Sequence, residues 1–311
     1  LTALDLSDCE RLERLSSDIG NLQVSTLTLR GCKLLKAVPE SFGKLDKLTK
    51  LNFYDCAALE SLPESIGNLT KVTEIDVSQC TALTSLPASL GQLTGLKKLT
   101  MPRTGLTTLP AAISSLSALE ELDVTGKEGT PGIRGVAADV FSGLTKLKKL
   151  NASNNSFSGD LSWLKNLSAL QTLRLDGNQL SGQLDLSQFS PNLTDVYLSN
   201  NKLEGNLNGI STLTKVRNLY LEHNLLSGEL PAELGNCSTL SYFYLSNNNI
   251  TGTIPVEVAK MNLGYSGLKL NGNRMSGEIP AEVLSSAVWK KLYPETNIYP
   301  QQEGYGFSNV K

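Results

Sequence analysis

The chain has 311 residues, of which 40% are hydrophobic and 19% are charged, so it can build a folded core. Its net charge is −2, and no basic run predicts a surface for nucleic acid or an anionic membrane. No apolar stretch approaches the roughly 18 residues that predict a membrane-spanning helix, so we expect no membrane insertion by this chain.

An apolar template, L-x-x-L-x-L-x-x-(N or C), recurs at intervals of 23 to 28 residues. Its x-L-x-L part alternates with period two, which predicts a short strand with leucine inward and x outward. One copy is too small to bury its own leucines, so neighbouring copies stack and share one core. The twelve copies predict a single solenoid over residues 1–311, and they begin at Leu1, Val24, Leu48, Val72, Leu96, Leu119, Leu147, Leu170, Leu193, Val216, Leu240 and Tyr265.

The last template position follows each strand and is predicted to point inward, so that these side chains form a ladder. An inward Asn can satisfy backbone groups of adjacent turns, and Cys tolerates burial at the same place. We expect all five cysteines to be free thiols, although adjacent turns are close enough for bridges. Lys127 fits the ladder poorly and predicts an irregular turn. The ladder holds Cys9, Cys32, Cys56, Cys80, Thr104, Lys127, Asn155, Asn178, Asn201, Asn224, Asn248 and Asn273.

The copies are of two kinds. Residues 1–126 carry phrases such as CAALESLPESIGNLTKV, and residues 147–282 carry Ser227-Gly228-Glu229-Leu230-Pro231 and its equivalents. The first kind resembles the leucine-rich repeats of plant intracellular immune receptors. The second resembles the plant-specific repeats of receptor-kinase ectodomains and secreted enzyme inhibitors. The resemblance implies an α/β solenoid, a leucine-rich-repeat horseshoe with about twelve parallel concave strands, short helical or 3-10 convex segments, and a second short strand at each S/T-G-x-I/L-P segment.

Two segments depart from the repeat. Residues 127–146 form an irregular insertion, in which Gly129, Pro131, Gly132 and Gly135 predict a loop. A helical turn is predicted after that loop, with Val140, Phe141 and Leu144 inward. The insertion is either a seam between the two kinds of repeat or a functional loop.

Residues 283–311 are predicted to be a C-terminal cap and tail. Apolar residues recur there at helical spacing, and an end repeat needs a cover for its core leucines. Protein binding by the aromatic tail is the alternative. The helical positions are Val283, Leu284, Val288, Trp289 and Leu292.

The sequence lacks the motifs that carry common catalytic chemistry: a P-loop, a Rossmann glycine fingerprint, G-x-S-x-G and H-E-x-x-H. With one histidine, His223, multi-histidine metal sites are excluded. The cysteines do not form C-x-x-C pairs. We therefore predict that the protein is not an enzyme and has no cofactor or metal.

Aromatic and basic residues gather at the outward strand positions of the later copies. Tyrosine and arginine are enriched at recognition surfaces, but tyrosines also stack along sheets without a ligand. His223 is predicted to be a solvated rim residue, since no nucleophile accompanies it. The partner-binding hypothesis names Arg174, Tyr197, Arg217, Tyr220, His223, Tyr242, Tyr244 and Lys269.

These patterns predict non-enzymatic recognition of a protein or peptide on the concave sheet, as a receptor-like or adaptor module. A secreted enzyme inhibitor and a structural or adhesive scaffold without a dedicated site remain as alternatives. We expect a monomer that does not bind nucleic acid. The sequence is compatible with both an extracellular and a cytoplasmic location.

Overall fold

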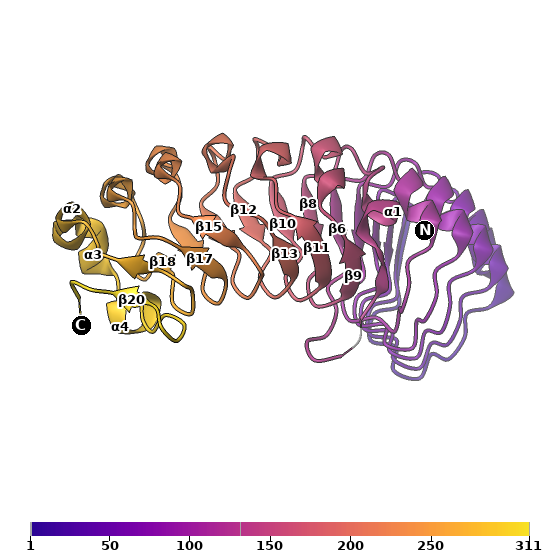
Figure 1. Ribbon diagram of the computed structural model, residues 1–311. Helices are drawn as coiled ribbons and strands as arrows, with labels where there is room; N and C mark the ends of the chain where they lie inside the picture. The colour runs from indigo at the N-terminus through magenta and orange to yellow at the C-terminus, as the bar shows by residue number, and fades with distance from the viewer. Residues whose placement is uncertain (1, 131, 311) are drawn as a thin grey trace. The chain divides into compact units, whose positions relative to one another are not determined.

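The computed structural model describes residues 2–130 and 132–310 (Figure 1). Leu1, expected to open the first template, Pro131, expected in the insertion loop, and Lys311, the expected end of the tail, lie outside the described residues. The chain divides into two compact units, Leu1–Ser158 and Gly159–Lys311, and the expected insertion at residues 127–146 falls inside the first of them.

The first unit carries seven short parallel strands, paired in the order β1-β2-β3-β4-β5-β6-β8. The central residue of each strand points into the core, as the alternation predicts; Leu51 and Ile75, for example, are paired in register and buried. The strands are β1 (Ala3–Asp5), β2 (Thr26–Thr28), β3 (Lys50–Asn52), β4 (Glu74–Asp76), β5 (Lys98–Thr100), β6 (Glu121–Asp123) and β8 (Lys149–Asn151).

The second unit repeats this arrangement with five parallel strands, in the order β10-β12-β14-β16-β18. The expectation of about twelve parallel strands is therefore confirmed. The strands are β10 (Thr172–Arg174), β12 (Asp195–Tyr197), β14 (Asn218–Tyr220), β16 (Tyr242–Tyr244) and β18 (Leu268–Lys269). We call the side of these strands, in either unit, that carries the outward side chains the strand face.

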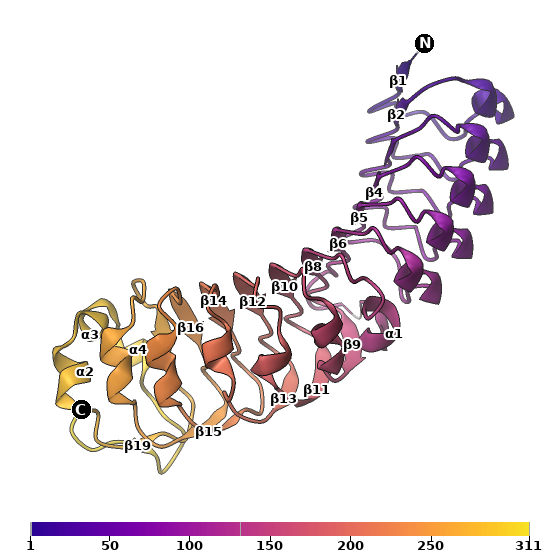
Figure 2. The same ribbon diagram turned by 90° about the horizontal axis from the view of Figure 1, so that it is seen from above.

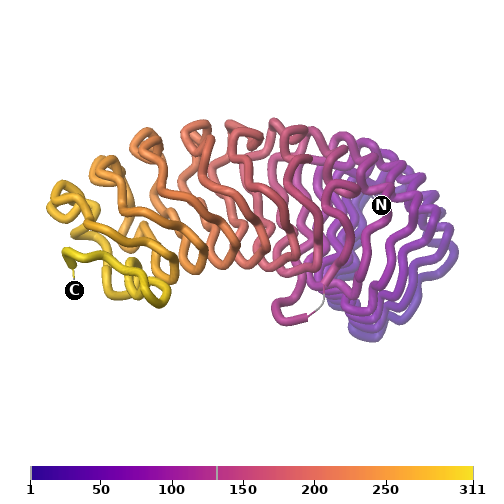
Figure 3. Tube along the Cα trace, viewed as in Figure 1, coloured from indigo at the N-terminus to yellow at the C-terminus, as the bar shows by residue number. Residues whose placement is uncertain are grey.

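Short 3-10 helices lie across the core from the strands in each unit, as Figures 2 and 3 show. Six of them follow a proline, which has no N–H and a fixed φ and so suits the start of a helical turn; Pro63 and Pro231 are examples. The helices are η1 (Ser17–Asn21), η2 (Glu40–Lys44), η3 (Glu64–Asn68), η4 (Ala88–Gln92), η5 (Ala111–Ser115), η6 (Ser162–Asn166), η7 (Leu186–Gln188), η8 (Ile210–Thr212), η9 (Ala232–Asn236) and η10 (Val256–Lys260).

The ladder differs chemically between the repeat types. Asn201 donates from Nδ2 to the carbonyls of Leu175 and Leu198, and its Oδ1 accepts from the Leu180 N–H at 3.0 Å. Cys56 makes a single bond, from its thiol to the Leu29 carbonyl at 3.1 Å. All five cysteines are free, as expected. Burial raises the pKa of Cys56 and of Cys80 to about 12, so these thiols remain protonated donors.

Further short strands lie beside the main ones, and three of them contain or end in the first residues of an S/T-G-x-I/L-P segment, as the resemblance implied. These are β15 (Ser227–Glu229), which pairs with β17 (Asn249–Thr251), and β19 (Ser276–Gly277), which pairs with β20 (Gly306–Phe307). The others are β7 (Arg134–Val136), β9 (Ser156–Gly159), β11 (Gln179–Gln183) and β13 (Lys202–Glu204).

Helices occur in the expected insertion and in the C-terminal segment, but Gly135, expected in a loop, lies in strand β7. Helix α1 (Ala137–Phe141) buries Val140 and Phe141, and Leu144 is buried just after it. The cap is three short helices rather than one: α2 (Ala281–Ser285), α3 (Ala287–Lys291) and α4 (Pro294–Asn297). The division falls at Ser286, which is extended and caps α3 by accepting from the Trp289 N–H.

One apolar position was assigned wrongly. Tyr265 begins the twelfth template copy, yet it is 74% exposed, whereas Leu263 is buried. The turn that contains Tyr265 is irregular, because the Gly267 N–H donates to the Gly264 carbonyl and Ser266 has a φ of 51°. This turn rotates the tyrosine out to solvent.

Candidate functional site

A stack of three tyrosines crosses consecutive strands on the strand face of the second unit. Tyr197, Tyr220 and Tyr244 end β12, β14 and β16, and each is paired in register with the next. Parallel strands lie about 4.8 Å apart, which is also a favourable distance between aromatic rings. The ring centroids are 4.8 Å apart for Tyr197 and Tyr220 and 4.5 Å apart for Tyr220 and Tyr244. We call these three residues the tyrosine stack.

The rings of the stack meet in two geometries. Tyr197 meets Tyr220 edge to face, with 82° between the ring planes, whereas Tyr220 and Tyr244 are nearly parallel at 12°. Tyr242, from the first position of β16, adds its edge to Tyr244 at 6.2 Å. Strand register alone does not choose between these arrangements, because both are favourable for aromatic pairs.

Each end of the stack carries a cation. The guanidinium of Arg174 lies 4.2 Å from the centre of the Tyr197 ring, and the Lys269 ammonium lies 4.1 Å from the centre of the Tyr244 ring. Lys269 also lies 4.0 Å from a carboxylate oxygen of Glu222. Arg174 has no carboxylate partner within residues 2–130 and 132–310. A ligand anion would therefore meet less competition at Arg174 than at Lys269.

Burial and crowding raise the pKa of two phenols of the stack. Burial, followed by the nearby Tyr244 and Tyr197, raises the pKa of Tyr220 to about 12. Burial also raises the pKa of Tyr244, and Glu222 adds to the rise. The protonated hydroxyls of Tyr220 and Tyr244 can both donate and accept a hydrogen bond to a ligand.

The other two predicted site residues lie apart from the rings. Arg217 is exposed, and its described hydrogen bonds are made by its backbone: its N–H donates to the Thr194 carbonyl, and its carbonyl accepts from the N–H groups of Ser241 and Tyr242. His223 has a left-handed backbone with a φ of 54°, and its Nε2 lies 3.2 Å from Nδ2 of Asn247. Asn247 has the same conformation one copy later. His223 thus occupies a left-handed turn position, where Asn, Asp and His are favoured.

The strand face of the first unit is built differently. Its first outward positions alternate in charge along consecutive strands, and the opposite charges pair. Lys50 contacts Glu74 at 2.9 Å, while Lys98 and Lys149 both contact Glu121, at 3.4 and 2.9 Å. Surface pairs of this kind contribute only about 0–1 kcal/mol each. These ion pairs nevertheless neutralise the charges of their side chains, so a charged ligand would have to compete with the existing partners.

Among the described residues, no group of three or more His, Cys, Asp or Glu is placed to hold a metal ion. The ring of His223 is directed to an amide and not to a nucleophile. None of the described helices is long and apolar enough to cross a bilayer.

Sequence reasoning missed one contributor to the site, Glu222. It lies two residues after Tyr220 on the strand face, accepts from the Ser199 hydroxyl at 3.4 Å, and contacts Lys269. The carboxylate partners a lysine that lies two copies further along the chain. The pair is seen only in the structure, where the side chains of Glu222 and Lys269 meet across β16.

Two sequence-family models match the chain. The model described as "Leucine-rich repeat region" matches residues 56–204, and "Leucine Rich Repeat" matches residues 215–237 and 239–261. Comparison with curated proteins finds no match. The repeat pattern in the sequence covers all three matched segments.

Several solved structures are similar to the chain. A leucine-rich-repeat protein of Leptospira interrogans is 27% identical over 94% of this chain and 76% of its own, with a TM-score of 0.67. A TDR receptor is 27% identical over 94% of this chain and 54% of its own, with a TM-score of 0.70. The ectodomain of the Arabidopsis receptor kinase HAESA, solved with an IDA peptide hormone ligand, is 24% identical over 88% of this chain and 55% of its own, with a TM-score of 0.65. The chain spans just over half the length of the two receptor chains.

Proposed function

Because the chain belongs to the leucine-rich-repeat proteins, we propose that it binds a protein or peptide on the strand face of its second unit. In this role it is a receptor-like or adaptor module and not an enzyme. The observation that carries the proposal is the tyrosine stack with Arg174 at its free end. Tyr220 and Tyr244 are only half-buried, so a partner could cover the remaining ring surface.

The stack suits recognition because it is already ordered. Tyrosines held by their neighbours lose little conformational freedom on binding, and this lowers the cost of association. Aromatic pairing stabilises a fold by roughly 0.5–1.5 kcal/mol per pair through the rings themselves. Stability alone therefore does not require the hydroxyl groups of the stack. Tyr and Arg are the residue types that most often dominate binding energy at interfaces.

The charges favour a partner with an acidic group near Arg174. Its guanidinium face rests on Tyr197, which leaves the N–H groups at its edge free for a carboxylate. Arg217 is a second exposed cation on the same face, with no described ion pair. Lys269 contributes less, because Glu222 already offsets its charge.

Similarity gives this proposal modest support. One similar structure at 27% identity is described as a receptor, and it shares the repeat architecture over nearly the whole of this chain. HAESA was solved with a peptide ligand, but its identity to this chain is lower and supports only the fold.

The proposal is tested by capture from native extract followed by affinity measurement. Wild-type protein is compared with a Tyr220→Ala/Tyr244→Ala double variant, and with a Thr28→Ala/Thr100→Ala variant that changes the same outward position in the first unit. We expect a partner that the wild type and the threonine variant capture and the tyrosine variant loses. With the purified partner, each single tyrosine variant should weaken binding by at least ~1 kcal/mol. Equal capture by the double tyrosine variant would place the binding surface elsewhere.

A further inference from the structure

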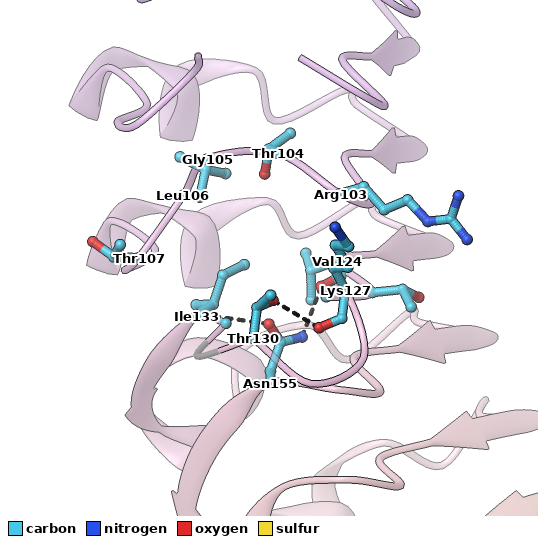
Figure 4. A pocket seen from close by; sticks show the side chains of 13 residues that line it. Arg103, Thr104, Gly105, Leu106, Thr107, Val124, Lys127, Thr130, Ile133 and Asn155 are labelled. Carbon is cyan, nitrogen blue, oxygen red and sulfur yellow. Dashed lines mark hydrogen bonds between the residues drawn. The ribbon is translucent and has the colours of Figure 1, made fainter. Parts of the chain in front are cut away.

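A polar pocket lies where the ladder of the first unit is interrupted (Figure 4). Two adjoining hollows, of about 120 Å³ and about 680 Å³, open between the turn after β5 and the turn after β6. The smaller hollow exceeds roughly tenfold the ~10–15 Å³ that a single water needs, so it can admit a chemical group. Both hollows are lined by Arg103, Thr104, Thr125, Gly126, Lys127 and Thr130.

The pocket exists because Lys127 stands at a ladder position that it cannot fill. The Lys127 side chain is exposed and does not enter the core. Asn155, the next ladder residue, donates to the Val124 carbonyl and accepts from the Ile133 N–H, both at 2.8 Å, as Asn201 does with the copy before it, and does not fill the place of Lys127. The chain after Gly126 therefore turns outward and leaves a hollow beside the core.

The cations of this pocket are unpaired, in contrast to their neighbours. Five lysines near the strands of the first unit each contact a carboxylate at 2.7–3.7 Å: Lys33, Lys50, Lys98, Lys148 and Lys149. Arg103 and Lys127 contact none in the described part of the chain. The one carboxylate in the lining is Glu128, so the formal charge of the pocket is one positive unit in excess.

The available donors are nitrogen atoms. The hydroxyls of Thr104, Thr125 and Thr130 already donate, to Met101, Asp123 and Lys127 respectively. The backbone N–H groups of Thr104, Gly105 and Lys127, all in the lining, donate to no described acceptor. Nitrogen donors with a net positive charge select an anion.

We propose that this pocket binds a single carboxylate carried on a short aliphatic stem. The carboxylate neutralises the excess charge of one, and the guanidinium of Arg103 can hold it with two parallel hydrogen bonds. Leu106, Val124 and Ile133 line the smaller hollow, and their apolar atoms receive the stem. Figure 4 shows Arg103 at one side of the pocket and Leu106 and Ile133 at the other. An acidic side chain and a chain's C-terminal residue both have this chemistry.

The site is tested by titrating isotope-labelled protein and following the amide signals of Thr104, Gly105 and Lys127 by NMR. N-acetylalanine supplies a terminal carboxylate and N-acetylisoglutamine a side-chain carboxylate. N-acetylalanine amide is the neutral control, and inorganic phosphate the competing anion. We expect saturable shifts with at least one carboxylate, and the tighter of the two identifies the source. Arg103→Gln and Lys127→Met should each raise its Kd about tenfold, the loss of one charged hydrogen bond.

A Lys44→Met variant on η2 is the matched control and should bind as the wild type does. Amide signals outside the pocket report whether each variant keeps its fold. Equal binding of the neutral amide, tighter binding of phosphate, no saturation with either carboxylate, or unchanged affinity in both pocket variants would each overturn the proposal. The site lies in the first unit and stands apart from the tyrosine stack.

Discussion

At the scale of single residues, the ionisation of Tyr220 makes the stability of the fold depend on pH. Its folded-state pKa is raised to about 12, mainly by burial, against about 10 in the unfolded chain. Above pH 10 the unfolded chain releases this proton while the folded chain retains it. The stability that depends on the neutral phenol is therefore complete below pH 10 and is lost as pH rises through 12.

We predict that replacing Tyr220 with Phe makes stability less sensitive to alkali. The variant keeps the ring contacts but has no proton to release. Denaturant unfolding between pH 8 and 12 should show a shallower decline for Tyr220→Phe than for wild type. Tyr54→Phe, which changes a tyrosine in the first unit, is the comparison and should decline as wild type does. Parallel curves for wild type and Tyr220→Phe would contradict the prediction.

Substitutions of His223 test whether this position depends on the chemistry of the imidazole or on the left-handed backbone conformation. Its left-handed backbone predicts that His223→Asn and His223→Gly keep wild-type stability within ~0.5 kcal/mol. His223→Val should lose about 1–2 kcal/mol or more, because a side chain with a branched Cβ is strained at positive φ. Urea unfolding measures the three differences. A His223→Val variant as stable as wild type would show that this conformation costs nothing here.

At the scale of the repeat element, the ladder residue determines how adjacent turns are joined. Asn201 satisfies carbonyls of two turns and one N–H, whereas Cys56 satisfies one carbonyl. The two kinds of copy therefore solve the same backbone problem with different numbers of bonds. The sequence predicted the inward position, and the structure adds the partners that each residue type bonds.

We predict that Asn201→Ala lowers the free energy of unfolding by at least ~2 kcal/mol, since each buried group left unpaired costs about 1–3 kcal/mol. Asn201→Cys should lose less, because a thiol can still donate to a carbonyl as Cys56 does. The neighbouring Asn200 is exposed and left-handed, so Asn200→Gly should be close to neutral. Guanidinium unfolding of the three variants gives the order, and equal losses at Asn200 and Asn201 would refute the ladder role.

At the scale of the whole molecule, the repeat pattern predicted the structural features that depend only on contacts between adjacent copies. The inward residues Leu173 and Leu219, the register of the tyrosines and the free cysteines all follow from stacking identical turns. Features that depend on side-chain reach or on one irregular turn did not follow. The link from Glu222 to Lys269 crosses a strand, and Tyr265 is exposed by a local glycine turn.

The irregular turn at Lys127 could likewise be predicted only in part from the sequence. A poor ladder residue predicted irregularity, but the pocket depends on the path of the chain after Gly126. Asn155, one copy later, makes ordinary ladder bonds. No spacing rule within one copy specifies the path of that loop.

Because each copy contacts only its neighbours, damage in one unit should spread within that unit first. We predict that Leu173→Asp, which puts a carboxylate at a fully buried position of β10, splits unfolding into two steps. Hydrogen exchange should accelerate across β12 and β14 before it does across β2 to β5. Gln171→Asp places the same charge at an exposed position two residues earlier and should leave one transition with wild-type stability. If Leu173→Asp had an unchanged thermal midpoint, the register of β10 would be wrong. If both units lost protection together, coupling between copies would extend well beyond nearest neighbours, and the division at Ser158 would not be a boundary of stability.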